Sequence, residues 1–549
     1  MQYIPKHPVY SPDLSNACMK PDFNLDYWRE NSFYYSLILF VWFLPFSEAM
    51  VSIAAGLLLV QAILLNSWKH PSVPHGSCLS LAMITSVFGV YLAGMIFTKD
   101  VPFAVYELKK VVFWIIIPTA FFLSPLLTPE RFIRLLVIFC ISVFLATLLA
   151  SFRLVFRDYF QISDFRDIVL ISHIRFSFQL LLAIIIAFWL LLTGNGLPSA
   201  KKYRIVWFLF PVWMIFFLFL LKSMTGIVAF LGTAFLVLLI FIVRQRNRTR
   251  KLVLSLILLA LVAIPAYSLF RVISVFYGVE PLSPEKVDRF SLSGNPYYFD
   301  FNAREKENGH WVKAYICEQE LREEWNKVAG IKYDSIDGGG YPCSATLIRY
   351  LTSKGLRKDS VGISRLAPED IRAIENGIAN KLYVNWGFSL YPRLYETIWE
   401  LDHYFHSGDP NNQSFSQRIE YIKASLVLIR KFPVTGIGTG SWKIRYAEAY
   451  REMESQLIPE NQGPSHNQYL NYLVKFGIPG FLFIMAMILI PLFREGHRRN
   501  FLLWFFLLSM AIVNLGDANL ETHMGLSFFC FFYSLFLWHF PAGYRNVTL

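Results

Sequence analysis

A histidine lies in a polar stretch that the sequence places at the start of a helix. The residues are Pro464-Ser465-His466-Asn467-Gln468-Tyr469-Leu470. Ser465 followed three residues later by Gln468 forms a capping box, which predicts a helix with Ser465 as its N-cap and His466 in its first turn. The positive end of a helix dipole disfavours imidazolium and favours an anion, so we expect a neutral His466 beside an anion site. This arrangement is typical of a general base. The alternative is a histidine at the start of a helix that has no catalytic role.

Arg175 could hold an anion near a membrane surface. It follows Ser172-His173-Ile174 and opens an apolar stretch. A guanidinium group can donate two hydrogen bonds to phosphate oxygens, so Arg175 is a candidate clamp for a lipid-linked phosphate. The alternative is an arginine that only extends from a membrane helix to the lipid headgroups.

A glycine-rich turn follows an amphipathic helix that should stop at Phe432-Pro433. Its residues are Gly436-Ile437-Gly438-Thr439-Gly440-Ser441. The turn lacks the GxGxxG spacing and the βαβ context of a nucleotide-binding loop. We therefore expect a tight turn whose backbone lies close to another part of the protein.

The elements that position these residues belong to a membrane. Of the 549 residues, 55% are hydrophobic and only 16% are charged, against about 25% charged residues in soluble domains. This composition excludes a soluble enzyme of two or three domains, because a single packed core stops growing beyond about 250 to 300 residues. Apolar runs long enough to cross a bilayer recur about twelve times. We place them at 33–47, 50–66, 78–97, 111–127, 132–151, 174–193, 205–221, 224–243, 252–272, 477–493, 500–515 and 525–540.

Basic residues orient these spans. Lys and Arg should lie in cytoplasmic loops, and with a cytoplasmic N-terminus those loops include 201–204, 244–251 and 494–499. The net charge of +12 is therefore an orientation signal, and no nucleic acid is expected as a partner. We expect an all-α polytopic membrane protein in contact with membrane lipids. The expected parts are a cytoplasmic segment (1–32), nine transmembrane helices (33–276), a periplasmic domain (277–465), a re-entrant or short periplasmic helix with three more transmembrane helices (466–540) and a cytoplasmic tail (541–549).

The periplasmic domain should be mainly helical, with tracts at Trp311–Ala329 and Pro368–Leu382. Cys317 and Cys343 are its only cysteines. An oxidising compartment would allow them to pair, and two free buried thiols are the alternative. No role can be assigned to the insertion at 282–402.

Ionisable side chains gather at the outer ends of the spans. They are Glu48, Arg175, Lys222, Arg271, Asp517, Glu521 and His523. A proton-coupled carrier would need acidic residues in the middle of its spans. The distribution favours chemistry at the outer face over transport through the membrane.

The residues of one region together resemble the signature of the O-antigen ligase and O-antigen polymerase superfamily. They are Arg418, the P-x-x-G-x-G-x-G stretch from Pro433 to Gly440, and His466-Asn467-x-Tyr469-Leu470-x-x-Leu473-x-x-x-Gly477-Ile478-x-Gly480. The topology, the large periplasmic segment and an arginine like Arg175 on an earlier helix extend the likeness over the rest of the chain.

This resemblance implies an inverting, metal-independent glycosyltransferase that needs no cofactor. It would be a multi-pass protein of the bacterial inner membrane with its active site facing the periplasm. It would transfer a glycan from undecaprenyl diphosphate to a sugar hydroxyl of the lipid A-core or another glycolipid. His466 would be the base on the acceptor hydroxyl, while Arg175 and Arg418 would bind the diphosphate and stabilise its charge. Asn467, Ser465 and Tyr469 would support the site. No His/Asp/Glu cluster has metal-ligand spacing.

Two positions depart from the family pattern. The family has an aromatic residue about four positions after its arginine, where this chain offers Tyr421 or Ile422. A Ser-Arg pair expected after the seventh span is replaced by Lys222-Ser223-Met224-Thr225, so we expect Lys222 to supply that positive charge.

Three other functions are compatible with part of the pattern. An O-antigen polymerase joining lipid-linked repeat units would use the same catalytic residues, and we favour the ligase because of the compact His-Asn motif. A transporter of lipid-linked saccharides should show internal repeats, which this sequence lacks. A membrane sensor would leave Arg175, Arg418 and His466 without a purpose.

Overall fold

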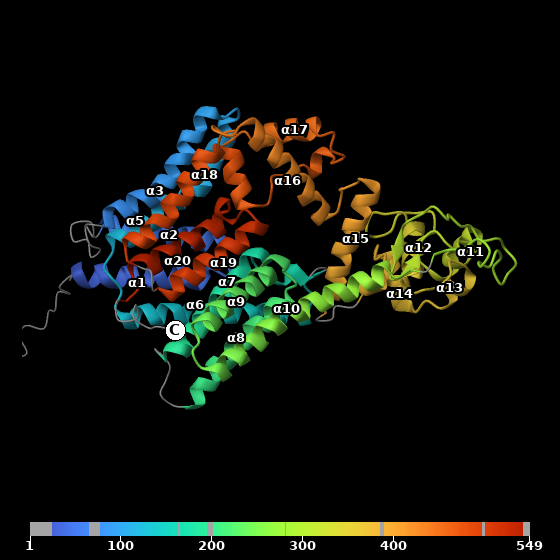
Figure 1. The fold of residues 1–549 in the computed structure, drawn as a ribbon, viewed down its shortest axis with the longest axis horizontal. Coiled ribbons are helices and arrows are strands. Elements are labelled where there is room, and N and C mark those ends of the chain that lie inside the picture. Colours follow the sequence, from blue (N-terminus) through green and yellow to red (C-terminus); the bar gives the residue numbers. More distant parts are fainter. Residues whose placement is uncertain are drawn as a thin grey trace, which may run out of the picture.

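The computed structural model describes residues 25–64, 77–162, 165–194, 201–279, 281–384, 389–496 and 500–541, and these residues form an almost wholly helical protein (Figure 1). The predicted segment 1–32 lies mostly outside them, as do Arg498, Arg499 and nearly all of the predicted tail. The first ten helices are α1 (Leu25–Phe43), α2 (Glu48–Leu64), α3 (Cys78–Ala93), α4 (Val101–Val111), α5 (Phe113–Leu123), α6 (Pro129–Val155), α7 (His173–Thr193), α8 (Lys201–Leu220), α9 (Met224–Arg244) and α10 (Arg248–Tyr277).

An inserted unit follows α10, and six further helices follow the unit. The unit contains β1 (Lys306–Glu307), β2 (His310–Trp311), α11 (Glu318–Val328), α12 (Cys343–Ser353), α13 (Ser360–Ser364) and α14 (Pro368–Glu375). The later helices are α15 (Tyr391–Ser407), α16 (Ser414–Lys431), α17 (Trp442–Glu452), α18 (Gln468–Arg494), α19 (Phe501–Gly516) and α20 (His523–Trp538). Short 3-10 turns include η3 (Gly94–Phe97), η4 (Phe165–Ile168), η5 (Lys381–Tyr383), η6 (Pro459–Asn461) and η8 (Asn519–Glu521).

The apolar stretches of the sequence are helical, as expected for a membrane protein. Six helices are long and apolar enough to cross a membrane, at Cys78–Phe97, Pro129–Val155, His173–Thr193, Met224–Arg244, Arg248–Tyr277 and Gln468–Arg494. Five shorter apolar helices coincide with other predicted spans. The stretch predicted at 111–127 contains only α5, of 11 residues, because the chain breaks its helix at Val112 and leaves it again at Ser124.

Two helices differ sharply in their burial. Every residue of α20 from Met524 to Trp538 is buried, largely among phenylalanine rings of neighbouring helices. In contrast, none of the apolar window of α10 is buried. Its buried residues are in its last turns, where Val272 and Phe276 pack against Tyr395 of α15. Helix α20 is thus a core helix, whereas α10 has the unburied apolar surface of a helix that contacts lipid.

The inserted unit has a core of its own. Trp325, Tyr333, Leu347 and Tyr350 are buried in it with other apolar side chains. Figure 1 shows the unit beyond the end of α10, on the side away from α1 and α2. The two predicted helical tracts are shorter than expected, since α11 begins only at Glu318 and α14 ends at Glu375. Cys317 and Cys343 are both buried and free, so the thiols do not pair.

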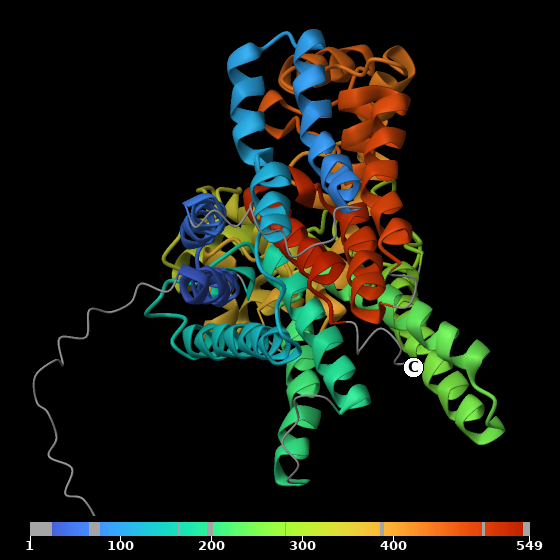
Figure 2. The ribbon, with the colours of Figure 1, turned by 90° about the vertical axis from the view of Figure 1, so that its left-hand side faces the viewer.

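The glycine-rich turn docks against α18 and the end of α3, which lie side by side in Figures 1 and 2. The backbone N–H groups of Ile437 and Gly438 donate to Val474 and Lys475 of α18, at 2.9 and 3.0 Å. A Cβ on Gly438 would lie 2.7 Å from the Gly94 carbonyl oxygen, so only glycine allows this approach. The expectation of a tight turn with a close backbone contact is confirmed. The turn makes this close contact with the backbone of other parts of the same protein, at Gly94, Val474 and Lys475.

A bend divides α18 at Gly477. That residue has φ 66° and ψ −176°, a conformation reserved for glycine, and Pro479 follows it. The N–H of Ile478 donates to the Pro433 carbonyl at 2.7 Å. The segment 468–476 is therefore a short helix set at an angle to the apolar helix 478–494. The residues just before 468 lie at the N-terminal end of α18.

Candidate active site

His466 precedes α18 and is not in its first turn. Its backbone is left-handed, with φ 44°. The N-cap is Asn467, whose Oδ1 accepts hydrogen bonds from the N–H groups of Tyr469 and Leu470, both at 3.0 Å. The capping box predicted for Ser465 and Gln468 is wrong, because both side chains bind elsewhere: the Ser465 hydroxyl donates to Asn471 Oδ1, and Gln468 Oε1 accepts from the Leu520 N–H.

The imidazole of His466 lies between an aromatic ring and a carboxylate. Its ring centroid is 5.7 Å from that of Tyr421, and its Nδ1 is 3.3 Å from Asp517 Oδ1. Since a carboxylate can only accept, Nδ1–H donates to Asp517, and in the neutral imidazole the lone pair is then on Nε2. The side chain is 44% exposed. Nε2 is therefore the atom that can take a proton from a molecule outside the protein.

Asp517 ends α19 and connects His466 to Arg175. Its Oδ2 is 3.9 Å from Arg175 Nη2, and its Oδ1 also accepts from the Ala518 N–H. Burial raises the pKa of Asp517, but the hydrogen bond from His466 and the charge of Arg175 outweigh burial and lower the pKa below its ordinary value. Asp517 is therefore an anion next to the imidazole. Sequence reasoning noted this residue at the end of a span and gave it no role.

Two guanidinium groups lie on helices that contribute to this site. Arg175 lies in the first turn of α7, and its buried Nε has no hydrogen-bond partner among the described residues. Arg418 lies on α16, one turn before Tyr421 and therefore on the same helix face. No hydrogen bond or ion pair joins its half-buried side chain to a described residue. Both groups retain donors for an anionic ligand.

Lys222 lies in the turn between α8 and α9, in a left-handed conformation with φ 51°. The start of α9 packs closely on this region: Gly226 faces Ser177 of α7, and Gly516 faces Thr225 of α9. The turn that carries Lys222 is therefore at the same end of the bundle as Arg175 and Asp517. The supply of positive charge to the site by Lys222 stays a prediction.

The expected supporting residues fix the start of α18 to the end of α19. Asn467 Nδ2 donates to the Leu515 carbonyl at 3.0 Å, and the Tyr469 hydroxyl donates to the Ala511 carbonyl at 2.8 Å. Because Asp517 follows α19 directly, these bonds set the separation between His466 and Asp517. Ser465 fixes the residue before His466 to α18, through its hydrogen bond to Asn471.

A buried ionic cluster lies beneath the site. Lys475 Nζ is 2.9 Å from both Glu107 Oε2 and Glu521 Oε2, and all three side chains are less than 10% exposed. Burial raises the pKa of Glu107, but Lys475 and Lys110 outweigh burial and lower it below its ordinary value. Asn471 links Glu521 to Ser465. The cluster joins α4, α18 and η8, and sequence reasoning missed it because its members are far apart along the chain.

Residues 377–485 match a family model described as O-Antigen ligase. The match confirms the resemblance to the O-antigen ligase superfamily. The O-antigen ligase segment contains Arg418, Tyr421, His466 and Lys475, while Arg175 and Asp517 come from helices on either side of it. The family supports a membrane glycosyltransferase of the O-antigen ligase or polymerase type. No curated protein matches the chain.

Proposed function

We propose that this protein is an inverting glycosyltransferase that transfers O-antigen, or a similar glycan, from undecaprenyl diphosphate to a sugar hydroxyl of the lipid A-core. The reaction takes place at the periplasmic face of the bacterial inner membrane. The observation that carries this proposal is the hydrogen bond of His466 to Asp517, which also pairs with Arg175. Arg418 lies one helix turn before Tyr421, whose ring lies beside that of His466. A base and two anion-binding groups are the parts that such a transfer needs.

The reaction is a single displacement. His466 Nε2 accepts the proton of the acceptor hydroxyl while the hydroxyl oxygen attacks the anomeric carbon of the donor sugar. The bond between that carbon and the diphosphate oxygen breaks on the opposite face, and undecaprenyl diphosphate leaves with the electron pair. Attack from the opposite face inverts the anomeric configuration. Asp517 stabilises the imidazolium that forms, as a buried carboxylate does in other base-histidine pairs.

Positive side chains stabilise the leaving group in place of a metal ion. Negative charge develops on the diphosphate as the glycosidic bond breaks, and fixed donors in a site of low dielectric constant are effective against such charge. Arg175 and Arg418 would provide them, with Lys222 as a third cation. We expect transfer to continue in EDTA, and loss of activity in EDTA would contradict the metal-free mechanism.

Glycan analysis of a deletion strain tests the reaction class. Loss of a ligase should leave long glycan polymers on the carrier lipid and none on the lipid A-core. Mass spectrometry of both lipid fractions would show this directly. Loss of a polymerase would instead leave single repeat units, and that result would contradict the ligase proposal.

A further inference from the structure

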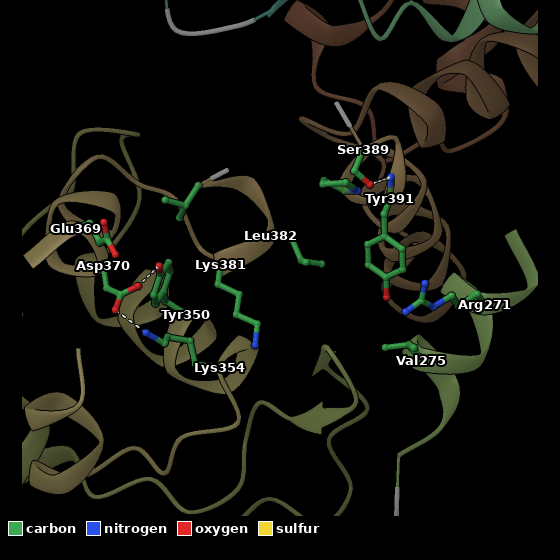
Figure 3. Close-up of a pocket in the computed structure, with 12 residues that line it drawn as sticks. Arg271, Val275, Tyr350, Lys354, Glu369, Asp370, Lys381, Leu382, Ser389 and Tyr391 are labelled. Atoms are coloured by element: carbon green, nitrogen blue, oxygen red, sulfur yellow. Dashed lines mark hydrogen bonds and ion pairs between the residues drawn. The ribbon is translucent and has the colours of Figure 1, made fainter. Parts of the chain in front are cut away.

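A cavity of about 650 Å³ lies where the inserted unit meets the end of α10. Figure 3 shows side chains from three directions around it. Arg271 and Val275 come from α10, Lys354 and Lys381 from the inserted unit, and Tyr391 from α15. None of these residues belongs to the candidate active site.

The cations of this cavity differ in how they are held. Lys354 is paired with Asp370 at 2.5 Å, and the Tyr350 hydroxyl also donates to that carboxylate. Arg271 and Lys381 are exposed, and their side chains form no hydrogen bond or ion pair with a described residue. Glu369, the other acid of the lining, lies on the far wall beside Asp370 (Figure 3). Two positive groups thus face the cavity from opposite sides with their donors available.

The position of Arg271 along α10 sets its depth in a membrane. Basic residues begin the helix at Arg248, Arg250 and Lys251, and no other charged residue occurs before Arg271. At 1.5 Å per residue, Lys251 and Arg271 are separated by about 30 Å, which is the thickness of the hydrocarbon core. The apolar window between them is unburied although α9 packs along the helix, so much of its surface is left for lipid to cover. Arg271 is therefore at the level of the lipid headgroups.

We propose that this cavity binds the phosphate-bearing headgroup of an anionic membrane lipid, held between Arg271 and Lys381. Both cations can donate to phosphate oxygens, and Arg can do so with two parallel bonds. The lipid chains would extend along the exposed surface of α10. Because one cation belongs to the span and the other to the inserted unit, the bound headgroup would fasten the unit to the membrane. This role is independent of glycosyl transfer.

The test is native mass spectrometry of the full-length protein in detergent, which resolves each bound lipid by mass. The probes are dioctanoyl phosphatidylglycerol, its zwitterionic phosphatidylcholine counterpart and glycerol 3-phosphate. The variants are Arg271→Gln, Lys381→Gln and the double variant. Lys332→Gln is the matched control, because Lys332 is an exposed lysine of the same unit outside the cavity. Arg271→Lys keeps the positive charge, so comparing it with Arg271→Gln separates the loss of charge from a general effect of substituting this residue.

We expect phosphatidylglycerol to bind about fivefold more weakly to each single variant, the size expected for one basic residue at a membrane surface, and more weakly still to the double variant. Lys332→Gln and Arg271→Lys should bind nearly as the wild type does. Equal binding of phosphatidylglycerol to the wild type and the double variant would overturn the proposal. Equal affinity for phosphatidylcholine would overturn the selection for an anionic headgroup. Equal affinity for glycerol 3-phosphate would show that the site takes a soluble phosphate ester, and would overturn the membrane role.

Discussion

Asp517 accepts a hydrogen bond from His466 although the two residues lie on separate elements, one after α19 and one before α18. Three further contacts preserve this pairing: Asn467 with Leu515, Tyr469 with Ala511 and Asp517 with Arg175. The pairing fixes which imidazole nitrogen faces the solvent. The chemistry proposed for His466 therefore depends on a residue outside the segment that matches the O-antigen ligase family.

Asp517→Asn should reduce the turnover rate by about a hundredfold or more, within the range that general-base catalysis contributes. The amide keeps the shape of the carboxylate but cannot stabilise the imidazolium that forms in the transition state. KM for the donor should change little, because Arg175 and Arg418 remain. Steady-state kinetics of the purified variant would measure both constants. A variant with wild-type turnover would show that Asp517 has no part in the reaction.

The pH dependence of stability should report the lowered pKa of Asp517. A carboxyl group with a folded pKa below its unfolded value of about 3.9 stabilises the protein above that value and loses this effect as pH falls through the folded pKa. We expect the difference in melting temperature between wild type and Asp517→Asn not to shrink between pH 8 and 5, because Asp517 remains an anion over that range. It should shrink only below about pH 4. A difference that already shrinks between pH 7 and 5 would indicate a raised pKa.

Lys475→Met should destabilise the protein by about 3 to 5 kcal/mol, because it leaves the Glu107 and Glu521 carboxylates buried without their shared cation. Lys110→Met is the matched control. Lys110 also pairs with Glu107 but is 26% exposed, so its loss should cost about 1 kcal/mol or less. Thermal unfolding in detergent would compare the two variants. Equal, small effects would contradict a structural role for the buried cluster.

Gly477→Ala should destabilise the protein far more than Gly194→Ala. Both glycines have positive φ, 66° and 69°. A Cβ on Gly477 would lie 2.4 Å from the Val434 carbonyl oxygen, whereas no atom of the described residues lies within 4 Å of one on Gly194. The control should therefore show only the conformational cost of about 1 to 2 kcal/mol. Similar melting temperatures for the two variants would mean that the turn before α17 does not need its close contact with α18.

The helices could be predicted from the sequence to a large extent, because long apolar runs have few alternatives to helix in a membrane. The start of α18 could not be placed correctly. Ser465 and Asn467 are both good N-cap residues, and the choice depends on Asn471, which binds the serine hydroxyl and leaves the cap to Asn467. A local sequence pattern cannot show that another side chain of the folded protein binds the predicted N-cap residue.

Most of the site residues that the sequence predicted lie within the matched segment, and Arg175 and Lys222 are the predicted cations outside it. Arg418 and His466 are recognisable from their spacing, and Tyr421 is next to His466 as an aromatic residue of that segment. Asp517, Glu107 and Glu521 come from other parts of the chain, and nothing in their neighbouring residues indicates a partner. Tertiary packing alone brings Glu107 to Lys475. The sequence therefore does not show that Glu107 is buried or that it pairs with a cation.

The most direct test of the account is glycan transfer by the purified protein in detergent, from an undecaprenyl-diphosphate-linked donor to lipid A-core. His466→Ala is compared with the wild type, and Lys332→Gln, in the inserted unit, is the control. The account predicts that His466→Ala loses a factor of about 10² to 10⁴ in transfer rate, while its melting temperature and donor binding remain near those of the wild type and the control transfers normally. A His466→Ala protein that transfers glycan as fast as the wild type would contradict the central claim that His466 is the base.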